Sequence, residues 1–153
     1  MATSVLCSSY KRELLSGVHS SSDVYKIALI KANPSRAYGA DTTSVGTPGS
    51  GAPSSANLGT DEVAPSGGYP SGGVILSGFS TSLQGTTAVL DFASPAPFTN
   101  ASISASGAVI YNASKSNSAV VVISFGMDIT STNGTFAITL PASGAATSLI
   151  RLG

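Results

Sequence analysis

Charge is what this sequence has least of. Only 9% of its 153 residues are charged, with seven basic and seven acidic side chains, so the formal net charge is zero. An ordinary soluble domain has roughly 25% charged residues, and a chain without that charge has little repulsion to keep its copies apart. Seven scattered basic residues also argue against nucleic-acid binding, which needs concentrated positive charge. The composition indicates a surface that is covered in an assembly; the alternative is a secreted β-domain solvated by hydroxyl groups.

Cysteine, histidine and long apolar runs are also scarce. Cys7 is the only cysteine, which excludes an internal disulfide, and with His19 as the only histidine a zinc cluster is excluded as well. No apolar run approaches the ~18 to 20 residues of a membrane span. The N-terminus lacks the basic start and apolar block of a secretory signal, so we expect the protein to be made and used without secretion.

The few residues that could carry chemistry form no pattern typical of an enzyme or a metal site. His19 could act in a serine hydrolase only with an acid such as Asp23 or Asp91, and no G-x-S-x-G segment is present. The acids of the central polar stretch match no calcium-loop spacing: Asp41, Asp61 and Glu62. We therefore predict no catalytic residue, metal, cofactor or small-molecule substrate. A hydrolase that uses His19, or one Ca²⁺ at a subunit contact, stays open as an alternative.

The only helical signal lies in residues 8–20. Leu14, Leu15 and Val18 recur at near-helical spacing and predict the packed face. A serine at the start can cap the helix, and Gly17 offers a stop. Because an isolated helix of this length is unstable in water, we expect it to dock on the rest of the protein.

A polar segment, residues 32–73, interrupts the apolar patterning that predicts regular secondary structure. It holds five of the eight prolines and is rich in glycine and serine, so we expect an extended arm or loop. The part at 46–56 cannot bury enough apolar area to order itself, and we expect a partner to order it. The rare apolar side chains of the segment are the predicted contacts with neighbouring chains, with local packing as the alternative: Tyr38, Leu58, Val63 and Tyr69.

Apolar patterning elsewhere indicates about eight short strands. Residues 107–126 predict a hairpin of two strands that are apolar on both faces, and Asn133-Gly134 predicts a turn. The strand segments are 23–31, 74–83, 87–92, 100–106, 108–111, 119–125, 130–141 and 148–152. They predict one domain, 1–153, with its main sheet region at 74–152 and open edges at 23–31 or 148–152. The fold class is all-β, an antiparallel β-sandwich such as a jelly roll, and a barrel is the alternative.

Much of the chain outside the polar segment resembles small structural proteins of tailed bacteriophages. The stretches that carry the resemblance are "YKRELLSGVHSSSDVYKIALI" (10–30), "GGVILSGFSTSLQGTTAVLDFA" (72–93), "GAVIYNASKSNSAVVVISFG" (107–126) and "NGTFAITLPASGAATSLIRL" (133–152). The polar segment departs from that pattern, because the corresponding region is shorter and richer in threonine in those proteins. The resemblance implies no catalytic residue.

The resemblance implies a place on the virion. We expect a head decoration, or cement, protein that binds the outside of the capsid and stabilises the junctions between capsid subunits. Its partners would be the major capsid protein and copies of itself, and the low charge predicts a dimer or trimer. Assembly would take place in the host bacterial cytoplasm. A structural or receptor-binding component of the tail or of a head fibre is the alternative.

Overall fold

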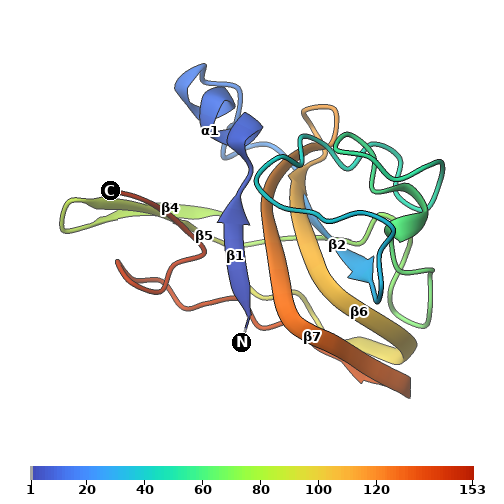
Figure 1. Ribbon diagram of the computed structural model, residues 1–153. Helices are drawn as coiled ribbons and strands as arrows, with labels where there is room; N and C mark the ends of the chain where they lie inside the picture. Colours follow the sequence, from blue (N-terminus) through green and yellow to red (C-terminus); the bar gives the residue numbers. More distant parts are fainter. Residues whose placement is uncertain (1) are drawn as a thin grey trace.

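The structure, a computed structural model that describes residues 2–153, is built on two open antiparallel sheets (Figure 1). The larger sheet has the strand order β1-β7-β6-β2-β3 and the smaller has β4-β5-β8. The prediction of a mostly β chain with antiparallel sheets and one short helix is confirmed. A sandwich or jelly roll stays a prediction. The elements are β1 (Thr3–Leu6), α1 (Ser8–Leu15), β2 (Tyr25–Lys31), the 3-10 turn η1 (Gly59–Asp61), β3 (Val74–Ile75), β4 (Ser80–Gln84), β5 (Thr87–Asp91), β6 (Phe98–Asn112), β7 (Ser118–Phe136) and β8 (Ile150–Leu152).

The long hairpin of β6 and β7 forms the middle of the larger sheet, and it confirms the hairpin predicted for residues 107–126. Sequence patterning divides β6 into two strands, 100–106 and 108–111, whereas the structure has one. The chain stays extended through Gly107, where the register with β7 shifts and where a side chain would collide with the carbonyl of Ile123. A bulge at a glycine therefore lets one strand continue where the pattern indicates a break.

The Asn133-Gly134 pair lies inside β7, and the prediction of a turn there is wrong. Asn133 has a φ of 45°, and its main-chain N–H donates to Ser102 Oγ at 3.0 Å. The pairing of β6 with β7 shifts register close to this point. Asparagine adopts positive φ in bulges as well as in turns, so the dipeptide alone does not separate the two.

β2 lies inside the larger sheet, between β6 and the two-residue β3. The expectation that it is an open edge is therefore wrong. Beyond β3, the same side of β2 is covered by the polar segment: Ile30 forms a bridge with Glu62, and the Val63 N–H donates to the Leu29 carbonyl at 3.0 Å. The outermost strands of the two sheets, within residues 2–153, are β1, β3, β4 and β8, and β8 confirms the edge predicted at 148–152.

Both faces of the larger sheet are covered near the hairpin turn, which explains why β6 and β7 are apolar on both faces there. The polar segment covers one face, where Tyr111 donates to the Gly72 carbonyl at 2.6 Å. On the opposite face, Tyr25 packs against Phe92, which directly follows β5, with ring centroids 5.3 Å apart. The core therefore lies on the two sides of one sheet.

α1 is shorter than the predicted helix and packs through Tyr10 and Leu14, so the predicted face is correct at Leu14 and wrong at Leu15. Its N-cap residue is Cys7, with no side-chain cap, so the expected serine cap is absent from the described chain. Gly17, with a φ of 68°, follows its end as predicted. The buried helix residue is Tyr10, whereas Leu15 is 93% exposed. The apolar spacing thus indicates the helix and Leu14, but it misses Tyr10 and wrongly includes Leu15.

The polar segment folds back on the larger sheet. Val45 and Leu58 are buried, and the Val45 N–H donates to the Asn117 carbonyl at 3.0 Å, next to the hairpin turn. Asn57 holds the stretch at 46–56: its Oδ1 accepts from the Thr47 N–H at 3.0 Å, and its Nδ2 donates to the Ser50 carbonyl at 3.0 Å. Side-chain hydrogen bonds to the main chain therefore order a stretch that apolar burial alone could not.

Candidate functional site

A polar cluster joins the end of α1 to the turn between β6 and β7. The His19 side chain is 2% exposed; its Nε2 donates to Glu13 Oε2 at 2.7 Å, and its Nδ1 accepts from Asn112 Nδ2 at 2.9 Å. Asn112 also donates to Asp23 Oδ2 at 2.8 Å, and its Oδ1 accepts from the Ser114 N–H at 3.0 Å. These contacts assign the His19 proton to Nε2. The hydrogen bond from Asn112 also lowers the pKa of Asp23.

The geometry of this cluster differs from that of a serine hydrolase. A catalytic histidine places one ring nitrogen on the serine hydroxyl and the other on an acid. Here Ser118 Oγ donates to the same Glu13 oxygen as His19, at 2.8 Å, and the second ring nitrogen faces an amide. The arrangement is typical of a satisfied structural network, and it ties α1 to the larger sheet.

Asp61 organises the first half of the polar segment. Its buried carboxylate accepts main-chain hydrogen bonds from Ser35 at 2.7 Å and Arg36 at 3.0 Å. The Tyr38 hydroxyl donates to it at 3.0 Å, and Lys31 Nζ lies 3.1 Å away. Burial opposes ionisation of the carboxyl group, but the hydrogen bonds outweigh it and lower the pKa of Asp61 to about 2.

Glu62 organises the second half. Its Oε1 accepts from the Tyr69 hydroxyl at 2.8 Å and the Gly72 N–H at 2.6 Å, and its Oε2 accepts from the Ser71 hydroxyl at 3.2 Å. Burial raises the pKa of Glu62 despite these donors. The Tyr69 oxygen also accepts the Leu29 N–H at 2.8 Å, and burial raises the pKa of Tyr69, which keeps its hydroxyl protonated as a donor.

The four predicted contact residues of the polar segment face this chain's own core. Leu58, Val63 and Tyr69 are each no more than 5% exposed, and Tyr38 is half-buried. Val63 and Tyr69 bond the main chain of β2, and the two tyrosines bond the buried acids. Their predicted contact with neighbouring chains stays a prediction.

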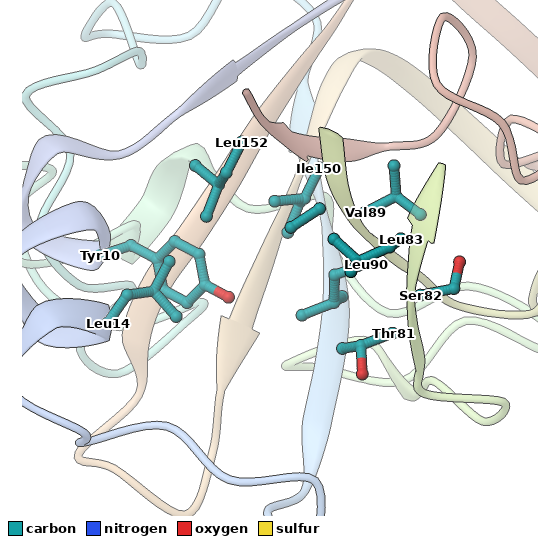
Figure 2. A pocket seen from close by; sticks show the side chains of 10 residues that line it. Tyr10, Leu14, Thr81, Ser82, Leu83, Val89, Leu90, Ile150 and Leu152 are labelled. Carbon is teal, nitrogen blue, oxygen red and sulfur yellow. The ribbon is translucent and has the colours of Figure 1, made fainter. Parts of the chain in front are cut away.

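An apolar groove of about 390 Å³ lies between α1 and the smaller sheet (Figure 2). Tyr10 and Leu14 form its helix side, and residues of β4, β5 and β8 form its sheet side. Figure 2 shows the tyrosine ring and the leucines of the two sides pointing toward each other. The residues that line the groove carry no charge, so it is suited to apolar contact.

Strand register places the groove residues of the sheet in two cross-strand rows. The rows are Thr81, Leu90 and Ile150, and, nearer the hairpin tip, Leu83, Ala88 and Leu152. In the first row Leu90 and Ile150 are buried, whereas in the second Leu83 is 74% and Leu152 is 46% exposed. We call this second row the outer row. It extends an apolar face beyond the part that the rest of the chain covers.

A second apolar groove, of about 380 Å³, lies between β1 and the segment 137–141. Phe125 and Phe136 line it from β7, with ring centroids 6.4 Å apart.

Within residues 2–153 no three acidic, histidine or cysteine side chains gather as a metal site, and no helix has the length and apolar character needed to cross a membrane. No known protein family, curated protein or solved structure matches this chain.

Proposed function

We propose that this chain is a structural subunit of a tailed-bacteriophage particle that decorates the outside of the head and stabilises the junctions between capsid subunits. The resemblance of four stretches to small phage structural proteins supports the placement. The observation that carries the assembly role is the outer row, an uncharged apolar row that begins at Leu83 on the open strand β4. Exposed apolar surface next to an unpaired strand edge is typical of surfaces that other chains cover.

The proposed mechanism is stabilisation by binding. A subunit that binds the assembled shell, and not its free parts, shifts the assembly equilibrium toward the shell. Many equivalent contacts on a symmetric shell then add through multivalency. In this proposal the two sheets act as the two layers of a β-sandwich, and the polar cluster at His19 holds α1 and its side of the groove in place. A surface that is already ordered loses less entropy on binding.

The test is to locate the protein on the particle. Tailed phage particles produced from the genome that carries this sequence are labelled with gold-conjugated antibody to the chain and imaged. Label over the head supports decoration. Label over the tail or over fibres supports the alternative placement and overturns decoration, and particles without label overturn both.

A second test asks whether the groove makes the contact. Particles produced without the protein receive purified wild type, Leu83→Asp or Ile75→Asp. Leu83 lies in the outer row and is 74% exposed; Ile75 is 65% exposed on β3, outside the groove, and serves as the matched control. We expect Leu83→Asp to lower head occupancy at least about tenfold, because it places a charge in an apolar contact, and Ile75→Asp to bind as wild type. Equal binding by both variants would remove the groove from the contact.

A further inference from the structure

We propose that β4 pairs with the β4 of a second copy of this chain across a two-fold axis, so that two three-stranded sheets join into one sheet of six strands. The inference deepens the proposed function by naming the contact between copies, and it rests on that function only in assigning this surface to assembly. Four features of the described chain carry it: the open edge, the direction of its main-chain groups, its symmetry and its lack of charge.

β4 is the longest of the four outermost strands and is exposed along its whole length. It has five residues, all exposed, against four in β1, three in β8 and two in β3. The β4–β5 hairpin projects from the body in Figure 1, which leaves its outer side open. Proteins block such edges with lysine, proline or bulges. The sequence of β4, "STSLQ", contains none of these, and its pairing with β5 is regular from Ser80 to Gln84.

The register fixes which main-chain groups face outward. The hairpin closes on the Gln84–Thr87 pair around the two-residue turn Gly85-Thr86, and in such a hairpin the closing pair exchanges both hydrogen bonds. Bonded pairs alternate along the ladder, so Thr81 and Leu83 direct their N–H and C=O groups away from β5. By the same alternation, Ala88 and Leu90, which lie opposite these two residues, direct their main-chain groups toward β8, which pairs with β5 from Ala88 to Leu90.

These groups are self-complementary about Ser82. In an antiparallel pair of two β4 strands centred on Ser82, Thr81 of each copy lies opposite Leu83 of the other. Each such pair exchanges two main-chain hydrogen bonds, which gives four across the axis. The contact is isologous and closes after two copies, so it produces a dimer and not an open chain.

The side chains favour a second copy as the occupant. An isologous contact brings a charge near the two-fold axis close to its own symmetry mate, and β4 has no charge to repel itself. By contrast, β8 carries Arg151 at its centre. Leu83 packs beside Thr81 of the partner strand, so the outer row of each copy continues into the partner's row of Thr81, Leu90 and Ile150, and the two apolar faces join.

The experiment measures the mass of the purified full-length protein by light scattering after size exclusion, over a range of concentrations. We expect the wild type to reach roughly twice the chain mass of 15.1 kDa. Leu83→Lys should give a monomer, because it places two like charges near the axis. Leu152→Lys makes the same change in the same row at the opposite edge of the sheet, 46% exposed, and should stay dimeric. Thr81→Pro removes an outward N–H that β5 does not use, and should also give a monomer.

Circular dichroism tests whether each variant keeps its fold, and we expect that it does because all three sites are exposed. A monomeric or trimeric wild type overturns the proposal, as does a dimer that survives both Leu83→Lys and Thr81→Pro or one that only Leu152→Lys disrupts. Labelled heads together with a monomer in solution would remove the β4 contact and keep the proposed function. A β4 dimer with unlabelled particles would do the opposite.

Discussion

The hydroxyl of Tyr69 offers a sharp test of how the polar segment is held. Its oxygen accepts the N–H of Leu29 in β2 and donates to the Glu62 carboxylate, both at 2.8 Å. Tyr69→Phe removes this oxygen and leaves the ring, which packs edge-on against Phe98 with centroids 5.2 Å apart. The substitution therefore changes hydrogen bonding and leaves packing almost unchanged.

The expected loss follows from the two groups left behind. The Leu29 N–H becomes a buried donor without a partner, which costs about 1–3 kcal/mol. Glu62, 5% exposed, loses one of three donors, and a hydrogen bond to a charged group contributes about 1.5–3 kcal/mol. We expect the free energy of unfolding to fall by about 3 kcal/mol in total. For a chain of this length, that lowers Tm by roughly 10 °C.

Urea denaturation followed by circular dichroism measures the change, with Tyr10→Phe as the matched control. Tyr10 is as buried as Tyr69, but its hydroxyl has no hydrogen-bond partner in the described chain. Removing it should be neutral or stabilising by up to about 1 kcal/mol. If Tyr69→Phe costs no more than Tyr10→Phe, the hydrogen bonds of Tyr69 do not hold the segment.

Three further predictions concern the core, the polar segment and pH. Val121→Asp should prevent folding, because it buries an unpaired charge at a fully buried position of β7. Met127→Asp, at a 66% exposed site on the same strand, should fold. Circular dichroism and solubility distinguish the folded variant from the unfolded one. Asn57→Ala should raise hydrogen exchange of the 46–56 amides about tenfold while β6 stays protected, since it removes the bonds that order that stretch; equal exchange in both proteins would refute this role. The pKa of Asp61 in the folded protein is about 2, below its ordinary value of 3.8, so its carboxylate stabilises the fold above about pH 4. As the pH falls to 2, the fold loses about 2 kcal/mol of this stabilisation. Asp61→Asn should flatten this part of the curve of stability against pH.

Much of the fold could be predicted from local pattern. The hairpin at 107–126, the strand at 87–92 and the short helix all follow from apolar periodicity and its breaks. The errors came where one signal fits two structures. Asn133 with positive φ fits a bulge as well as a turn, and Gly107 marks a bulge that the chain passes without ending the strand.

The polar segment shows a second kind of error. Its low apolar content predicts a stretch that needs a partner, and that reasoning counts burial alone. Asp61, Glu62 and Asn57 accept hydrogen bonds from main-chain N–H groups that lie 10 to 26 residues away in the sequence. The sequence shows both acids only as loop residues that match no calcium-loop spacing, because their partners depend on how the loop closes.

The sequence by itself determined the β class, the near absence of charge and the central hairpin, because each is a property of composition or of neighbours along the chain. Tertiary structure alone decided that β8 joins β5, that Tyr10 and not Leu15 faces inward, and that Leu83 and Leu152 lie in one exposed row on either side of Ala88. Those contacts join residues far apart in the chain, and no local periodicity encodes which of two apolar side chains the rest of the protein will cover.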